Sequence, residues 1–168
     1  AAARSAVDLR SMSNDITLAE LQEFLAEFWF HYDEAHFDEL AAAHAADVHY
    51  LTRSDSGASP FEELMSPQLD GRDAVMAWLT AHRKESPYPL RHHVTNIHRT
   101  GTDGDAVRTR SYIVVNQIAN YVPFMVSSGI VNAAIRRGAN GLEFTDVEVV
   151  LDTTNSVNLA DVHADATP

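Results

Sequence analysis

The feature that most constrains the fold is a change in the spacing of apolar residues near residue 90. Before it, apolar side chains recur every three or four residues, which is the period of an amphipathic helix. After it, the chain is rich in Val, Ile, Thr and Tyr, which is typical of strands. The predicted helices cover residues 17–32, 35–45 and 71–84, and the predicted long strands cover 90–99, 106–118, 121–136 and 142–153.

Short motifs predict where several elements begin and end. Thr17 and Glu20 have the spacing of a capping box in front of the first helix. Asp70 is placed to cap the helix at 71–84. The TDGD and RGANG segments predict tight turns between strands, whereas residues 118–121 form a poorer turn, which leaves that strand boundary open.

Helices followed by a run of strands indicate an α+β domain. We expect a strongly curved antiparallel sheet that begins with a short strand at 48–52. About three N-terminal helices should close this sheet into a cone-shaped barrel with a pocket on its concave face. Residues 53–69 hold turn formers and two prolines, so we expect a long loop there that is a candidate lid or binding segment.

Composition excludes several classes of function. The chain has 168 residues, a formal net charge of −12 and no cysteine. The negative charge argues against nucleic-acid and anionic-membrane partners. The lack of cysteine excludes disulfides, thiolate metal sites and a cysteine nucleophile. Because no apolar run reaches the length of a membrane helix, we expect a soluble, cytoplasmic protein.

The length suits one domain, which we expect over residues 15–155. Residues 1–14 are expected to be a leader that is disordered or foreign to the natural protein, with Met12 as the natural start. A genuine N-terminal arm is an equal alternative. Residues 156–168 are expected to be a C-terminal tail.

Two of the nine histidines are adjacent, as His92 and His93 in the predicted strand RHHVTN (91–96). Successive strand side chains point to opposite faces, so only one of the two can face a pocket. The other histidines are scattered, which favours ordinary surface or partly buried positions. No metal site is expected, because no HExxH motif occurs and adjacent strand histidines cannot chelate one ion.

Asp33 is a candidate partner for one of these histidines. It follows Tyr32 at the end of the apolar stripe of the first helix. A buried carboxylate beside an imidazole fixes its tautomer and stabilises the imidazolium that forms when it takes a proton. Such a pair suits removal of a proton next to a carbonyl group. The alternative is that Asp33 faces solvent at the helix end, and spacing alone leaves both open.

Two segments resemble the SnoaL-like branch of the NTF2-like superfamily, namely DEAHFDEL (33–40) and RHHVTN (91–96), followed by DGDA at 103–106. The matching residues are an Asp four residues before an aromatic and a second Asp, and a His four residues before an Asn. RHHVTN and VVLD (149–152) also resemble the β subunits of aromatic-ring-hydroxylating dioxygenases. The resemblance covers roughly residues 15–153.

The resemblance implies that His92 faces the cavity and that Asp33 and His92 abstract a proton without a metal or cofactor. Tyr50 and Tyr112 are the candidates to assist at the substrate oxygen, although either can be a core tyrosine. A homodimer is implied as well. A hydrophobic small-molecule ligand is expected, and its candidate contacts are Trp29, Ile113, Phe124, Val149 and Leu151.

Three interpretations of function remain open from the sequence. The first is a lyase or isomerase of the dehydratase, isomerase or cyclase type that acts on a hydrophobic cyclic or aromatic carbonyl compound. The second is a non-catalytic β subunit that assembles with a dioxygenase α subunit. The third is a ligand-binding module without turnover.

Overall fold

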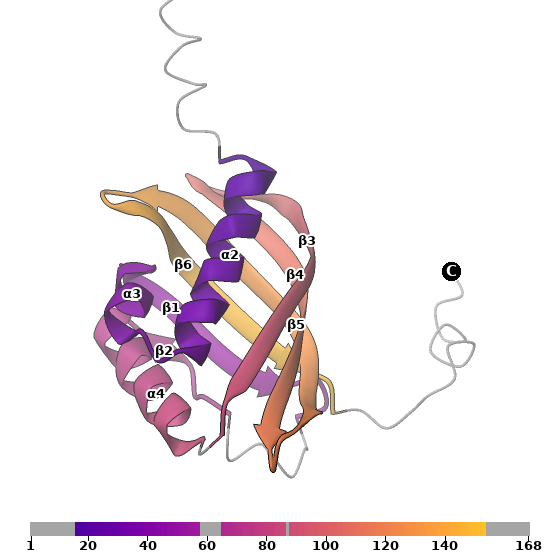
Figure 1. Cartoon of the computed structure of the whole chain (residues 1–168). Coiled ribbons are helices and arrows are strands. Elements are labelled where there is room, and N and C mark those ends of the chain that lie inside the picture. Colours follow the sequence, from indigo (N-terminus) through magenta and orange to yellow (C-terminus); the bar gives the residue numbers. More distant parts are fainter. Residues whose placement is uncertain (1–15, 58–64, 87, 154–168) are drawn as a thin grey trace, which may run out of the picture.

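The computed structural model describes residues 16–57, 65–86 and 88–153. The predicted leader and tail, and the middle of the loop at 53–69, lie outside the described residues. Within these ranges, three helices and six strands form one α+β unit, which confirms the predicted fold class. Helix α2 crosses one face of the sheet, while α3 and α4 lie beside one of its edges (Figure 1).

The helices are α2 (Leu18–Asp33), α3 (Phe37–Ala42) and α4 (Arg72–Glu85). The capping box of α2 is confirmed: the Thr17 hydroxyl accepts from the Glu20 N–H at 3.2 Å, and the Thr17 N–H donates to the Glu20 carboxylate at 2.8 Å. The prediction that Asp70 caps α4 is wrong. Gly71 is the N-cap and makes no side-chain bond, because Asp70 belongs to a short strand and bonds elsewhere.

The sheet contains all six strands in the order β2-β1-β6-β5-β4-β3. Its first strand begins at His44, inside the segment predicted as helix, because the Phe144 N–H bonds to the Ala43 carbonyl at 2.8 Å and pairing with the last strand takes over. The strands are β1 (His44–Ser54), β2 (Leu69–Asp70), β3 (Leu90–Asp103), β4 (Ala106–Ala119), β5 (Val122–Gly138) and β6 (Gly141–Leu151).

The sheet is mixed rather than antiparallel throughout. β1 runs parallel to β6, whereas the other neighbouring strands are antiparallel, so the prediction of an antiparallel sheet is corrected on this point. The sheet is also not closed into a barrel, because β2 and β3 stand at its two edges. Helix α2 packs along β3 and covers that edge (Figure 1).

The poor turn at 118–121 proves to be a tight hairpin. Asn120 and Tyr121 connect β4 to β5, and both have positive φ, at 51° and 68°. Two successive left-handed residues match the twist of a two-residue hairpin turn. The sequence concealed this turn because Tyr121 stands where glycine is the usual residue.

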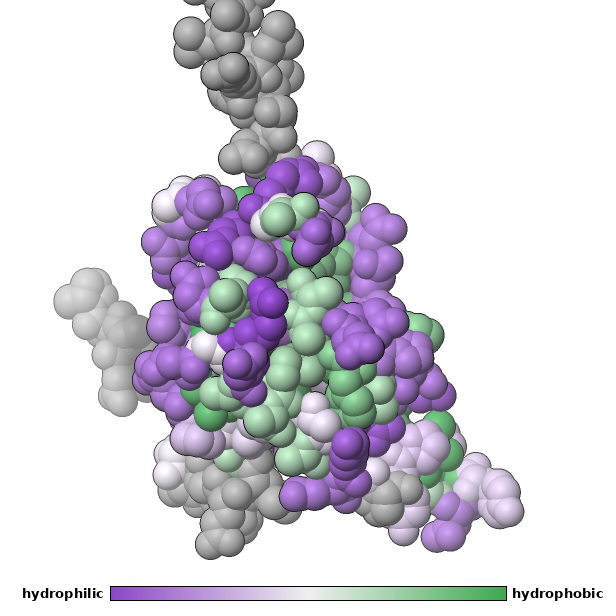
Figure 2. All heavy atoms as spheres, turned by 90° about the vertical axis from the view of Figure 1, so that its left-hand side faces the viewer, coloured by the Kyte–Doolittle hydropathy of each residue, from purple (hydrophilic) through white to green (hydrophobic). Residues whose placement is uncertain are grey.

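The core lies between α2 and the concave face of the sheet. Phe28 on α2 packs edge-on against Phe144 on β6, with ring centroids 4.9 Å apart. Leu21, Leu25 and Val48 are almost completely buried around them. On the side of the molecule that carries α3 and α4, hydrophobic side chains form a central band bordered by hydrophilic ones (Figure 2).

Candidate active site

The adjacent histidines on β3 face opposite sides of the sheet. His92 pairs in register with Val115 and turns inward, and its side chain is only 9% exposed. His93 is exposed on the other side, where its ring lies 3.4 Å from the Asn116 side chain. The expectation that His92 is the inward member of the doublet therefore agrees with the geometry.

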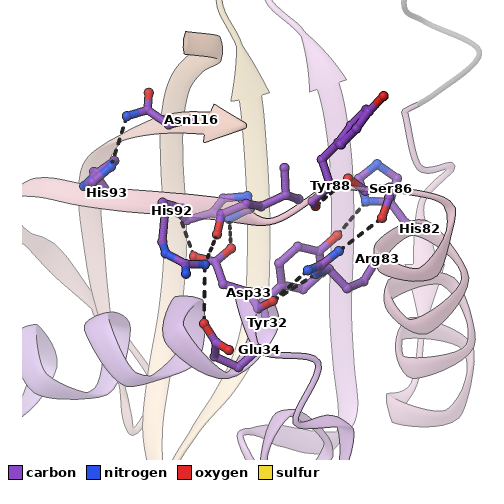
Figure 3. Close-up of polar contacts among 12 residues, drawn as sticks. Tyr32, Asp33, Glu34, His82, Arg83, Ser86, Tyr88, His92, His93 and Asn116 are labelled. Atoms are coloured by element: carbon purple, nitrogen blue, oxygen red, sulfur yellow. Dashed lines mark hydrogen bonds and ion pairs between the residues drawn. The ribbon is translucent and has the colours of Figure 1, made fainter. Parts of the chain in front are cut away.

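Asp33, the last residue of α2, reaches His92 with both carboxylate oxygens. Its Oδ1 lies 2.5 Å from the His92 Nδ1, and its Oδ2 accepts the His92 backbone N–H at 2.8 Å (Figure 3). Because ionised aspartate only accepts hydrogen bonds, this contact assigns the proton to Nδ1 and leaves a lone pair on Nε2. Among the described residues, no other side chain hydrogen-bonds to the His92 ring, so the Nε2 lone pair has no protein donor there.

Aromatic rings from the same helix hold the His92 ring. Trp29 stacks on it with 4.7 Å between centroids and 12° between planes. Tyr32 meets it edge-on at 5.2 Å and 90°. Both aromatic side chains are buried, and the Trp29 indole N–H has no hydrogen-bond partner among the described residues. The imidazole is thus fixed in an apolar environment with one polar contact, which is Asp33.

A second histidine, His82 on α4, completes a polar cluster that sequence reasoning missed. The Tyr32 hydroxyl lies 2.6 Å from the His82 Nδ1 (Figure 3). Trp78 stacks on the His82 ring at 4.7 Å. Partial burial lowers the pKa of His82, and burial raises the pKa of Tyr32 far above its usual range. The four-residue spacing of Trp78 and His82 was the available signal, because residues at i and i+4 share a helix face.

Tyr50 lies on the inward side of β1, buried and in ring contact with Trp78 at 5.6 Å. Burial raises its pKa to about 12. The Tyr50 hydroxyl accepts a long, 3.5 Å hydrogen bond from Thr52. Its phenol is also close enough to Tyr32 to raise the pKa of that residue. Both hydroxyls therefore stay protonated near neutral pH.

Residues 17–148 match the SnoaL-like domain family. The chain belongs to this family. No curated protein sequence matches the chain. Solved structures with the same fold include ActVI-ORFA from Streptomyces coelicolor, which is 20% identical, with a TM-score of 0.65 and coverage of 79% of this chain and 95% of that one.

Two further structural neighbours are less similar in sequence. The β subunit of benzoate 1,2-dioxygenase from Burkholderia mallei is 17% identical, with a TM-score of 0.67 and coverage of 86% and 97% of the two chains. A candidate scytalone dehydratase from Novosphingobium aromaticivorans is also 17% identical, with a TM-score of 0.62 and coverage of 84% and 88%. At these identities the likeness establishes the NTF2-like fold.

Two residues predicted for the site of this SnoaL-like domain are placed elsewhere. Tyr112 lies on the outer face of the sheet and is 51% exposed. It pairs with Thr95 and Ile130. Thr95 is three residues after His92 on the same strand, so the two side chains point to opposite faces. Phe124 is exposed near the tip of the β4–β5 hairpin, beyond the register shift that follows Val115. Neither residue is brought to the Asp33–His92 pair.

The other predicted contacts line the inward face of the SnoaL-like domain. Ile113 and Val149 are buried there, and the half-buried Leu151 packs against the core. Trp29 contacts His92 directly, as described above. Asn96, the last residue of the RHHVTN segment, is exposed at a register shift in β3, with φ of 55°, and its carbonyl accepts a bond from the His98 ring.

A pocket of about 400 Å³ opens beside Asp33. Its lining comes from the ends of α2 and α4 and the start of β3, and consists of Asp33, Glu34, Arg83, Ser86, Tyr88, Pro89 and Arg91. Arg91 pairs with Glu34 at 3.3 Å. A larger hollow of about 610 Å³ lies over the polar outer face of the sheet, away from Asp33. His92 lines neither of these two hollows.

Among the residues that the structure describes, no group of three His, Asp or Glu side chains is arranged to hold a metal ion. None of the described helices is long and apolar enough to cross a membrane.

Proposed function

We propose that the chain is a SnoaL-like enzyme that abstracts a proton from the carbon next to the carbonyl group of a hydrophobic cyclic or aromatic compound. The observation that carries this proposal is the contact of both Asp33 oxygens with His92 in a nearly dry, aromatic environment. An imidazole with an orienting carboxylate on Nδ1 and a lone pair on Nε2 has the arrangement of a general base.

In the proposed reaction the His92 Nε2 takes the proton, and the electron pair of the broken C–H bond moves toward the carbonyl oxygen. Asp33 stabilises the imidazolium, and the Tyr50 hydroxyl is the proposed donor for the developing enolate oxygen. In a dehydration, the enolate then expels a hydroxyl group from the next carbon. The His92 imidazolium returns its proton to that group, and water leaves as a carbon–carbon double bond forms.

Proton abstraction can be measured before the natural substrate is known. The protein is incubated in D₂O with a panel of cyclic and aryl ketones, and loss of the proton next to the carbonyl is followed by NMR. His92→Gln is expected to slow exchange by ~10²- to 10⁴-fold, the usual contribution of a positioned base. His93→Gln is the matched control, since the neighbouring histidine faces outward. Equal rates in both variants would refute the Asp33–His92 mechanism.

A second candidate function is assembly with another protein, and the β4–β5 hairpin favours it. Residues 111–135 contain no charged side chain, although the chain carries a net charge of −12. The tip of the hairpin exposes large apolar side chains by 46% to 102%, namely Tyr121, Val122, Phe124, Met125 and Val126. Exposed apolar clusters of this kind mark protein contacts. A homodimer or a dioxygenase α subunit is the partner proposed.

The hairpin proposal is tested by measuring mass in solution. A double substitution, Val122→Asp with Met125→Asp, is expected to convert a dimer into a monomer in light scattering after size exclusion. Leu18→Asp, at another exposed apolar position, is the control. Stable co-purification with an iron–sulfur α subunit would favour the β-subunit role, and a monomeric wild-type chain without a partner would contradict assembly.

A further inference from the structure

The pocket beside Asp33 contains a contact that the proposed reaction does not use. Arg83 on α4 donates from Nε at 3.1 Å and from Nη2 at 2.8 Å to the backbone carbonyl of Asp33 (Figure 3). Its Nη1 lies 3.4 Å from the carbonyl of Ser86, in the segment that leads to β3. The guanidinium therefore joins the end of α2, the end of α4 and the approach to His92.

The carbonyl of Asp33 lies at the C-terminal end of helix α2 and is not used by the backbone bonds of the turn that follows the helix. The last carbonyls of a helix lack partners within it. Here the chain turns back at Ala35, with φ of 58°, and the N–H groups of Glu34, Ala35 and His36 bond to the carbonyls of Phe30, Tyr32 and His31. The next carbonyl, that of Asp33, is bound by Arg83 instead.

The position of this peptide group determines the position of the carboxylate. Asp33 must satisfy the His92 N–H and the His92 ring at once, with contacts of 2.8 and 2.5 Å. A two-point contact tolerates little movement of the α-carbon, and a misplacement of about 1 Å at such a group can cost ~10²-fold in rate. The planar guanidinium of Arg83 directs two N–H groups at one carbonyl oxygen, which restrains the position of that oxygen.

Neighbouring residues of α4 act on neighbouring residues of α2. His82 bonds to the hydroxyl of Tyr32, and Arg83 bonds to the carbonyl of Asp33. The two contacts hold the last turn of α2 against α4, so the carboxylate is presented to β3 from a supported helix end. An unsupported helix end would fray.

We propose that Arg83 is a positioning residue that sets the geometry of the Asp33–His92 pair, an inference that rests on the function proposed above. Arg83 touches neither the Asp33 carboxylate nor the His92 ring, and it acts through the backbone of Asp33. The chain offers a matched control in Arg72, on the same helix, whose Nε donates to the His44 carbonyl at 2.7 Å.

The test is a proton NMR measurement on Arg83→Met, Arg83→Lys and Arg72→Met. The His92 Nδ1 proton, in a short buried bond, should give a low-field resonance, which His92→Gln assigns by removing it. In Arg83→Met we expect this resonance to move upfield and to exchange with solvent at least ~10-fold faster. Arg83→Lys, which cannot form the two-point contact, should be intermediate, and Arg72→Met should match wild type.

The D₂O exchange assay on the same variants separates this inference from the proposed function. We expect Arg83→Met to slow exchange by ~10- to 100-fold with little change in KM. An unchanged low-field resonance in both Arg83 variants, with a stability loss equal to that of Arg72→Met, would overturn the positioning role. A displaced resonance with no ketone exchanged even by wild type would support the positioning role and contradict the proposed function alone.

Discussion

Within the described part of the chain, two Asp–His pairs have nearly equal distances and very different surroundings. Asp33 and His92 meet at 2.5 Å with side chains 6% and 9% exposed, whereas Asp70 and His49 meet at 2.6 Å with side chains 65% and 60% exposed. Distance alone therefore does not identify a site. The difference lies in what else each pair touches and in how much water reaches it.

The buried Asp33–His92 pair is restrained by contacts with several other groups, whereas the exposed Asp70–His49 pair is restrained by the pairing of its two strands. Asp33 also accepts the His92 N–H, Trp29 stacks on the ring, and Arg83 holds the Asp33 backbone. Asp70 and His49 are opposite each other on β2 and β1. In water such a pair gains little, because solvent screens the charges and the side chains lose freedom. In the buried pair, removal of either partner leaves a polar group unsatisfied.

Replacing the aspartate of each pair by alanine should produce the largest difference in stability between the two pairs. Asp33→Ala is expected to reduce the free energy of unfolding by about 3–5 kcal/mol, because it leaves the His92 N–H and ring without partners. Asp70→Ala should cost about 0–1 kcal/mol. Urea denaturation of both variants measures the contrast. Similar losses in the two would show that burial does not distinguish the pairs.

A third histidine shows what burial does without a carboxylate. His44 is fully buried against Phe28 and Phe144, and its Nδ1–H donates to the Leu40 carbonyl at 2.7 Å. Burial lowers its pKa from 6.5 to about 4. The unfolded chain binds the proton more readily, so stability is present above pH 6.5 and is lost as the pH falls toward 4.

From this shift we expect the free energy of unfolding to fall by about 3 kcal/mol between pH 6.5 and 4. The measurement is a series of denaturation curves across that window. His44→Met, which does not titrate, should flatten the dependence, and His49→Gln, which changes an exposed ring, should not. A wild-type stability that rises as the pH falls through this window would contradict the assignment.

Tyr50 and Tyr112, the two tyrosines predicted for the site, lie on the inner and outer faces of the sheet, so substituting each one compares the contributions of the two faces to the exchange rate. Tyr50→Phe should lower the ketone exchange rate by ~10-fold, since it removes one donor to the developing oxygen anion in a buried site. Tyr112→Phe should leave the rate unchanged, because its hydroxyl lies on the outer face. Both variants keep their rings, so thermal melts should be close to wild type. A larger rate loss in Tyr112→Phe would reverse the assignment of faces.

The effect of salt on the stability of the two pairs is expected to be the smallest of these differences. Raising the ionic strength from 0.01 to 1 M shortens the screening length from about 30 to 3 Å. The stability difference between wild type and Asp70→Ala should therefore shrink to within error, while that for Asp33→Ala persists. A salt dependence of equal size for both pairs would show that solvent reaches the buried one.

Much of the fold was readable from residue periodicity, and the departures have local causes. The amphipathic stripe and the Thr17 capping box predicted α2 almost to the residue. The parallel pairing of β1 with β6 was not predictable, because period-two alternation does not encode strand direction. The hairpin at Asn120 and Tyr121 was obscured for a different reason, since tertiary pairing of β4 with β5 imposes a left-handed conformation on residues that rarely adopt it.

The candidate site was predictable in part. Strand alternation limited the doublet to one inward histidine, and family resemblance selected His92 and Asp33. Tyr112 was misplaced because the sequence shows which strand residues share a face but not which face is concave. Arg83 was missed because its partner is a backbone carbonyl 50 positions away, which no spacing rule identifies. For His82, the spacing from Trp78 indicated a shared helix face but not the phenol partner on α2.

The parallel pairing of β1 with β6 also bears on how the chain is made. Residues 49–54 of β1 pair with residues 146–151 of β6. β1 therefore gains this neighbouring strand only after almost the last described residues have emerged from the ribosome. Contacts this distant in sequence form slowly. Until then, β1 lacks the neighbour that covers its longest edge, and the apolar faces of α2 and β1 lack the β6 side chains that pack on them in the finished domain.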